Sequence, residues 1–415
     1  MSLQLTDTEH NHKFGSITLE QNPKLGFYTV GEQHYYSKVQ ALMEGTRTNQ
    51  FPVWNFSNKV FGSQPWTEEP NTGIRELYRL RAQQLRDKYD YIRIECSGGG
   101  DSAQAVYNFL LNDIHVDEVL FRFPEAGKKK LPADPFNFHA ENHLSEYEFA
   151  TRPMLHWIKT HHPKVKITVH DYSEDMLSDE DRDESWVYAA KDFLQPAHVT
   201  KFTTYHTMDQ RILADQGKKI CILYGIDKPK MCIRDGKWYA YFIDFQANYA
   251  NPDIGEYPNI TNEYFFWTPD FPELLRKQAH LIKNWFNQPA NRHLQFLARW
   301  PNHSNLQRTA YEAMIKPLIY IDYDPTTFQV AKPATNFYSE MDHWFYSQFQ
   351  DHKLYRSWKA GINFVENNID EKYFNQEFGR RVGFVGFLSP FYYVGDVQAN
   401  EPTYLKISSN THDRF

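Results

Sequence analysis

The chain has 415 residues, of which 41% are hydrophobic and 23% are charged, a composition typical of a folded globular protein. It excludes a wholly disordered, collagen-like or coiled-coil chain. The 45 Lys and Arg residues against 52 Asp and Glu residues leave a net charge of -7, which excludes a protein whose whole surface binds nucleic-acid phosphates.

The three cysteines, Cys96, Cys221 and Cys232, form no Cys-x-x-Cys pair. Such scattered cysteines do not make a disulfide framework, and they predict a protein of the reducing cytoplasm. The first residues show no basic stretch followed by an apolar segment. The most apolar run, residues 382–395, is too short and too glycine-rich to cross a bilayer. We therefore expect a cytoplasmic protein without a membrane segment.

Residues 1–72 have an irregular pattern, which predicts an elaborated N-terminal extension. A strand-like segment at residues 26–30 precedes a stretch rich in Pro and Asn that is punctuated by aromatic residues. Apolar residues then recur at helical spacing, which predicts an amphipathic helix over residues 73–88.

The next segment predicts a strand, a glycine loop and a helix in direct succession. Residues 91–96 alternate like a strand, residues 97–102 read Ser-Gly-Gly-Gly-Asp-Ser, and residues 103–112 resume helical periodicity. A second strand is expected at residues 116–123. Two strands joined by one helix imply a right-handed parallel unit.

The same alternation continues to about residue 245, and it predicts an α/β fold with a Rossmann-like, mostly parallel sheet and helices on both faces. Further helices are expected at residues 141–161, 186–194 and 205–216, and further strands at residues 165–169 and 219–224. Later helices, at residues 273–286 and 305–315, predict a mostly helical C-terminal region. We thus expect three parts, residues 1–72, 73–250 and 251–415.

The glycine loop, Ser97-Gly98-Gly99-Gly100-Asp101-Ser102, stands where α/β sheets place phosphates, at a strand end that opens a helix. Glycines let the backbone approach an oxyanion, and the two serine hydroxyls can donate to phosphate oxygens. Asp101 suits a Mg²⁺ ligand better than a phosphate contact. The alternative is a flexible turn in which Asp101 caps the helix.

The loop resembles the Ser-Gly-Gly-x-Asp-Ser loop of the PP-loop ATP pyrophosphatase superfamily, to which asparagine synthetase and argininosuccinate synthetase belong. The resemblance extends over about residues 73–245. It implies that ATP and Mg²⁺ bind, that ATP is cleaved between its α- and β-phosphates, and that the loop holds the pyrophosphate. AMP would be left on a substrate oxygen, from which a nucleophile displaces it.

A second contact to metal and pyrophosphate is expected at a later strand end, residues 224–229. By position, Asp227 would be the second Mg²⁺ ligand and Lys228 the catalytic cation beside Asp101. A type I turn at Pro229 is the alternative. Phe121 and Arg122, at the end of another strand, are candidate neighbours of the nucleotide.

Departures from the family pattern reduce the number of reactions that the resemblance implies. Ser2 stands where a glutamine amidotransferase needs a cysteine, and no cysteine pair serves sulfur transfer. The sequence favours an AMP-forming ligase or amidating enzyme with a nitrogen nucleophile. The alternatives are a non-catalytic adenine-nucleotide-binding or interaction protein and a sulfur transferase or reductase-like enzyme. The sequence does not identify the acceptor, which is a small molecule or a base. It contains no strong signal for nucleic-acid binding. It is compatible with a homo-oligomer.

Three weaker signals have simpler interpretations. The histidines at 156, 161 and 162 fit the end of a helix, where positive side chains suit the dipole. Lys128, Lys129 and Lys130 fit a solvated loop, and Arg211 fits a surface ion pair as well as a phosphate neighbour. The Phe- and Gly-rich run at residues 379–395 is expected to pack as core.

Overall fold

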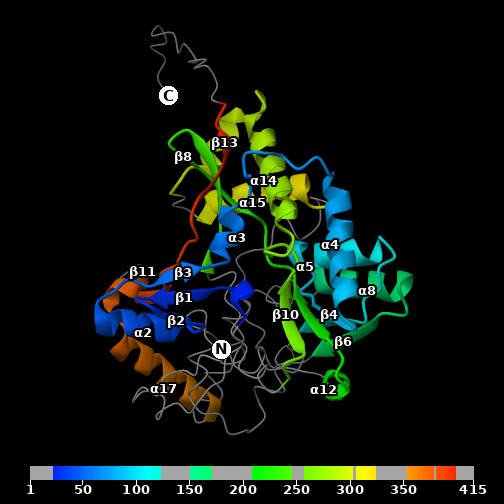
Figure 1. Cartoon of the computed structure of the whole chain (residues 1–415), viewed down its shortest axis with the longest axis horizontal. Helices are drawn as coiled ribbons and strands as arrows, with labels where there is room; N and C mark the ends of the chain where they lie inside the picture. Colours follow the sequence, from blue (N-terminus) through cyan, green and yellow to red (C-terminus); the bar gives the residue numbers. More distant parts are fainter. Residues whose placement is uncertain are drawn as a thin grey trace, which may run out of the picture.

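The computed structural model describes residues 22–122, 150–170, 208–244, 257–301, 305–323, 353–377 and 380–398. Its centre is a five-stranded, all-parallel sheet with the strand order β10-β7-β4-β5-β6 (Figure 1). The strands are β4 (Tyr91–Glu95), β5 (Glu118–Arg122), β6 (Lys166–His170), β7 (Ile220–Tyr224) and β10 (Ile260–Tyr264). This mixed α/β arrangement confirms the parallel sheet and is compatible with a Rossmann-like core.

The strand order changes direction at β4. From β4 the chain proceeds through β5 to β6 on one side, and β7 and β10 lie on the other. The register pairs Tyr91 with Ile220 and Glu95 with Tyr224, so β4 and β7 end at the same level. The crevice outside the carboxyl ends of two such strands is where open α/β sheets bind their ligands.

Helices cover both faces of this sheet because its strand residues alternate between two cores. Cys221 and Leu223 of β7 face the main core, together with buried residues of α4 (Ile74–Lys88) and α5 (Gly100–Leu110). Ile220 and Ile222 face the other way, where they pack with Ala214 of α12 (Met208–Asp215). The expected helix at residues 73–88 is confirmed.

Parts of the expected helices at residues 141–161 and 205–216 are described, as α8 (Arg152–His161) and α12. The helix expected at residues 186–194 lies outside the described residues. No described helix has the length and apolarity needed to cross a membrane.

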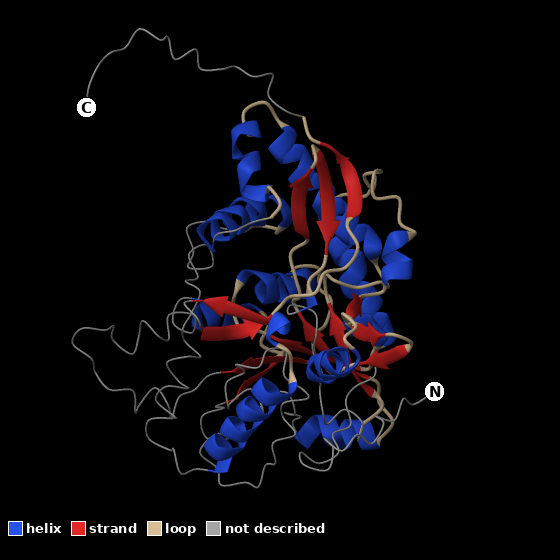
Figure 2. Ribbon diagram, turned by 90° about the vertical axis from the view of Figure 1, so that its left-hand side faces the viewer, coloured by secondary structure: helices blue, strands red, loops and turns tan. Residues whose placement is uncertain are grey.

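The mostly helical C-terminal region is not confirmed. The described part contains α14 (Pro272–Asn287), α15 (Asn305–Ile319) and α17 (Lys353–Asn368), together with strands β10, β11 (Phe374–Glu377), β12 (Arg380–Phe384) and β13 (Tyr392–Asp396). β10 is an edge of the parallel sheet, although it follows the expected boundary at residue 250. β13 joins β8 (Lys230–Arg234) and β9 (Lys237–Tyr241) in an antiparallel sheet, which stands above the other strands in Figure 2.

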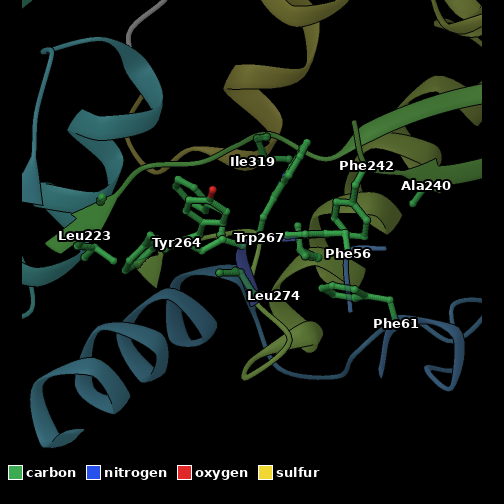
Figure 3. Packing of buried hydrophobic residues seen from close by; sticks show 14 of the residues in the cluster. Phe56, Phe61, Leu223, Ala240, Phe242, Tyr264, Trp267, Leu274 and Ile319 are labelled. Carbon is green, nitrogen blue, oxygen red and sulfur yellow. The ribbon is translucent and has the colours of Figure 1, made fainter. Parts of the chain in front are cut away.

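The N-terminal part is interleaved with the core. It contains η1 (Pro23–Leu25), β1 (Phe27–Val30), β2 (Gln33–Tyr35), α2 (Lys38–Thr48), β3 (Val53–Asn55) and α3 (Asn58–Gly62). Phe56 and Phe61 pack against Phe242, with ring centroids 4.9 and 4.6 Å apart, and Trp267 lies 5.0 Å from Phe242 (Figure 3). These four buried aromatic residues join segments almost 200 positions apart into one core.

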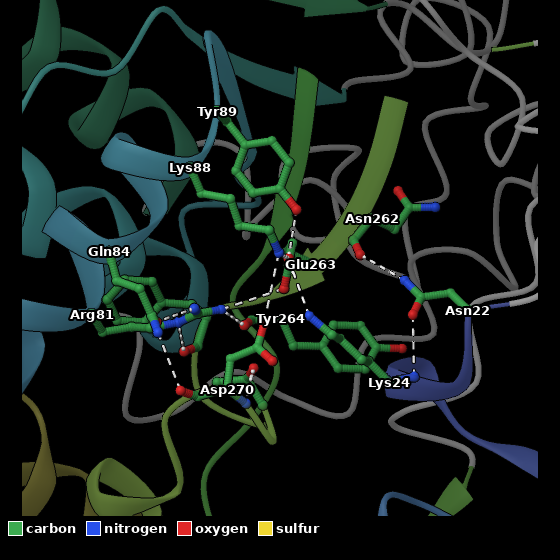
Figure 4. A network of polar contacts seen from close by, with 12 residues as sticks. Asn22, Lys24, Arg81, Gln84, Lys88, Tyr89, Asn262, Glu263, Tyr264 and Asp270 are labelled. Atoms are coloured by element: carbon green, nitrogen blue, oxygen red, sulfur yellow. Dashed lines mark hydrogen bonds and ion pairs between the residues drawn. The ribbon is translucent and has the colours of Figure 1, made fainter. Parts of the chain in front are cut away.

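A charged network ties the N-terminal residues to the parallel sheet (Figure 4). Glu263 of β10 is buried, and its carboxylate accepts hydrogen bonds from Lys88 at 2.5 Å and from the Tyr89 hydroxyl at 2.6 Å. Arg81 and Lys24 lie 3.6 and 4.0 Å from the same carboxylate. Burial would raise the pKa of Glu263, but the cations lower it below its ordinary value. The carboxylate therefore stays ionised and holds three segments together.

A second buried ion pair joins α2 to the C-terminal residues. Lys38 Nζ lies 2.8 Å from Asp244 Oδ2 and also donates to the Val385 carbonyl at 2.8 Å. The Asp244 carboxylate further accepts hydrogen bonds from the Tyr28 hydroxyl at 2.7 Å and from the Phe387 backbone N–H at 2.9 Å. Both oxygens of the Asp244 carboxylate and the Lys38 ammonium group thus have hydrogen-bond partners inside the core.

Lys38→Met should lower the free energy of unfolding by about 3–5 kcal/mol, because it leaves the Asp244 carboxylate buried without its cation. Arg47→Met on the same helix is the matched control, since Arg47 pairs with Glu44 at the exposed surface and its loss should change little. Urea unfolding measures both. Equal losses in the two variants would contradict the importance of the buried pair.

Candidate functional site

The glycine loop joins β4 to α5, and its two serine hydroxyls make hydrogen bonds to the backbone of the loop. Ser102 Oγ donates to the Gly99 carbonyl at 3.2 Å and accepts from the Ser97 N–H at 3.2 Å. Ser97 Oγ in turn accepts from the Gly99 N–H at 3.3 Å. The helix begins at Gly100, earlier than the expected residue 103, and no side chain caps it. The N–H groups of its first turn are therefore available to an anion.

Gly98 is required by the path of this loop. It has a φ of 80°, and a Cβ atom there would lie 2.5 Å from the backbone of Ala150 and Thr151, which lead into α8. The Thr151 hydroxyl donates to the Ser97 carbonyl at 2.5 Å. The loop is thereby packed between the N-termini of α5 and α8.

The segment after β7 packs directly against the backbone of the glycine loop after β4. A Cβ atom at Gly225, directly after β7, would lie 2.6 Å from both the Asp101 carbonyl oxygen and Ser102 Cα. Lys228 Nζ then lies 2.9 Å from Asp101 Oδ2 and 2.9 Å from Asp227 Oδ1. The structure therefore brings together the two segments that the sequence placed at one edge of the sheet.

Helix α15 adds residues that the sequence analysis did not identify. Glu312 lies 3.6 Å from the ammonium groups of both Lys228 and Lys230, and the Tyr320 hydroxyl donates a hydrogen bond to Asp101 Oδ1. The sequence signal was a spacing of four residues from Glu312 to Lys316 and on to Tyr320, directly after the helix, a pattern equally typical of a solvated face.

The charges of this cluster stabilise one another. Burial would lower the pKa of Lys228, but the carboxylates around it raise it well above its ordinary value. Burial would raise the pKa of Asp227, but Lys228 and Lys230 lower it. The pKa of Lys316 is lowered by burial and by Lys228. Lys228 is therefore an ammonium ion and Asp227 a carboxylate at neutral pH.

The contacts of Asp227 do not fit the predicted role of second Mg²⁺ ligand. It is 3% exposed, and its two carboxylate oxygens accept from Lys228 at 2.9 Å and lie 3.0 Å from Lys230. Both oxygens are occupied by ammonium groups, so Asp227 acts as their counter-ion. The oxygens of Asp101 also accept from Lys228 and Tyr320, but Asp101 is only half-buried, so it stays the better candidate for an oxygen ligand of Mg²⁺. Among the described residues, no group of three or more His, Cys, Asp or Glu side chains is arranged to hold a metal.

Asp101 does not cap α5 with its side chain, since its carboxylate binds Lys228 and Tyr320 instead. The Phe121 side chain is fully buried in the hydrophobic core, and the place of Phe121 beside the nucleotide stays a prediction. The side chain of Arg122 and residues 128–130 lie outside the described part.

The remaining sequence signals have structural explanations. His161 Nδ1 lies 3.0 Å from the Trp157 carbonyl one turn earlier in α8. Arg211 is exposed on α12. Phe384, Phe387 and Tyr392 are buried, which confirms that the aromatic run packs as core.

The three cysteines are buried, and none of them forms a disulfide. Burial raises the pKa of Cys232 to about 12 and the pKa of Cys221 well above its ordinary value. The thiolate is the reactive form of cysteine, so neither of these two residues is suited to nucleophilic sulfur chemistry.

In comparisons with known proteins, no protein-family model matches the chain and no curated sequence is similar enough to match it. The assignment of a function therefore depends on the geometry of the loop cluster and on the resemblance of the glycine loop.

Gly225→Ala should destabilise the protein by about 1–3 kcal/mol or more, because its methyl group would displace the backbone at Asp101 and Ser102. Gly62→Ala is the control, since a Cβ atom there meets nothing within 4 Å. Urea unfolding measures both changes. A Gly225→Ala variant as stable as the control would contradict the close packing of the two loops.

Proposed function

We propose that the chain is an AMP-forming ATP pyrophosphatase that adenylates a substrate oxygen and passes the activated group to a nitrogen nucleophile. The observation that carries this proposal is the position of the glycine loop. It opens α5 at the point where the strand order reverses, and Lys228 from the next strand end lies 2.9 Å from Asp101. Such crevices bind nucleotides in open α/β sheets.

The residues present suit the leaving pyrophosphate. The first-turn N–H groups of α5 and the positive end of its dipole favour a phosphate anion. Mg²⁺ would arrive on the triphosphate of ATP and neutralise charge on the leaving group, with Asp101 as its candidate ligand. Holding the acceptor oxygen in line with the α-phosphorus would supply the rest of the rate enhancement.

In the structure, Lys228 binds two carboxylates, whereas the sequence predicted that it binds pyrophosphate. It is 5% exposed and is engaged by the carboxylates of Asp101 and Asp227, so in the free protein it holds Asp101 in place. The direct contact of Lys228 with pyrophosphate stays a prediction. It requires the ammonium group to exchange one carboxylate for a phosphate oxygen.

A nucleotide-binding protein without catalysis is the second candidate. It is favoured by Asp227, which pairs with two lysines and so leaves Asp101 as the one metal ligand among the two that the sequence predicted. Sulfur transfer is not favoured, because all three cysteines are buried. The products formed from ATP separate the remaining two candidates.

With α-labelled ATP, Mg²⁺ and a small-molecule extract as the source of acceptors, the protein should form AMP and pyrophosphate. Asp101→Asn should lower the rate by about 10² to 10³, because it removes the charge that would hold the Mg²⁺ of the leaving group. Asp235→Asn is the control, since Asp235 lies in the turn between β8 and β9 and its side chain is 87% exposed. Formation of ADP and orthophosphate alone would contradict the proposal, and unchanged ATP would favour the second candidate.

A further inference from the structure

Helix α15 presents a polar face to the glycine loop. Glu312 and Lys316 lie one turn apart on α15, and Tyr320 directly follows its last residue, with its N–H still bonded to the Lys316 carbonyl at 2.9 Å. Two of them make contacts at the site: Glu312 lies 3.6 Å from Lys228 Nζ, and the Tyr320 hydroxyl donates to Asp101 Oδ1. This side of α15 therefore forms a wall of the cluster.

The end of α15 is attached to the helices around it through the backbone on both sides of Tyr320. The Ile319 carbonyl accepts a hydrogen bond from the Tyr78 hydroxyl at 2.6 Å. The Gln104 amide donates to the Ile321 carbonyl at 2.7 Å and accepts from the Ile321 N–H at 3.1 Å. Because Gln104 follows Asp101 by three residues on α5, the tyrosine is fixed relative to the helix that carries the carboxylate.

Two donors share one oxygen of Asp101. Oδ1 accepts from the Tyr320 hydroxyl and lies 3.1 Å from Lys228 Nζ, which also lies 2.9 Å from Oδ2. Rotation of the carboxylate would break the tyrosine contact and weaken the lysine contacts. The Tyr320 hydroxyl is the donor of its contact, because the carboxylate oxygen of Asp101 accepts.

We infer that Tyr320 is a positioning residue that orients the Asp101 carboxylate for the magnesium-bound leaving group, an inference that rests on the proposed function. The attachment of α15 to the core does not need this hydroxyl. Tyr78 and Gln104 bind the backbone, and the Tyr320 ring packs 5.8 Å from Phe266. Removal of the hydroxyl alone should therefore change the reaction more than the fold.

Tyr320→Phe should lower kcat about 10-fold, which corresponds to the loss of one hydrogen bond to a charged group, and leave the KM for ATP within about 2-fold. Tyr311→Phe is the matched control, because Tyr311 is a buried tyrosine of α15, the helix that Tyr320 directly follows, and is stacked on Phe286. Both variants should have similar urea midpoints. In an Asp101→Asn background, Tyr320→Phe should have no further effect on the rate, because it acts through that carboxylate.

Equal rates for Tyr320→Phe and the wild type, equal losses in Tyr320→Phe and Tyr311→Phe, or additive losses with Asp101→Asn would each overturn the inference. A wild type that forms no AMP would contradict the proposed function instead. The inference is then tested by calorimetric titration with magnesium pyrophosphate. Affinity about 10-fold weaker in Tyr320→Phe than in Tyr311→Phe would support it, and equal affinities, including no binding by either, would overturn it.

Discussion

The burial of the Lys228 ammonium group is the constraint on which the candidate site depends. A charge removed from water is costly unless it is paired and hydrogen-bonded. Its partners come from three distant segments, with Asp101 after β4, Asp227 after β7 and Glu312 on α15. These segments must therefore meet for the charge to be satisfied. The meeting point is also the place where the strand order reverses, which joins the requirement of the fold to the location of the site.

The same principle explains how the outer segments become part of one core. The carboxylate of Glu263 on β10 gathers cations from α4 and from the N-terminal residues, and Asp244 is shared by Lys38 and the Phe387 backbone. In each case one buried carboxylate receives donors from segments far apart in the sequence. Such pairs add little net stability over apolar contacts, but they disfavour every arrangement that separates the partners. We interpret them as determinants of how the segments are arranged.

The sequence predicted the features that depend on local pattern. The glycine loop between β4 and α5, and the buried strand β7 with Lys228 beyond it, follow from periodicity and from residue types in succession. It did not predict β10, because Asn262 and Glu263 are buried polar residues that break the apolar run of a central strand. It also missed Tyr320, since a contact with Asp101 more than 200 residues away leaves no local trace. The burial of the Phe121 ring in the core was not predicted either, because position at a strand end does not show on which side the ring lies.

The most direct test of the account is a crystal structure of the protein grown with Mg²⁺ and pyrophosphate. The account predicts pyrophosphate density against the backbone N–H groups of Gly100, Asp101 and Ser102, in the first turn of α5, with the Asp101 carboxylate on the metal side. Density at another part of the surface, or an empty loop at saturating pyrophosphate, would contradict the claim that this loop binds the leaving group of ATP.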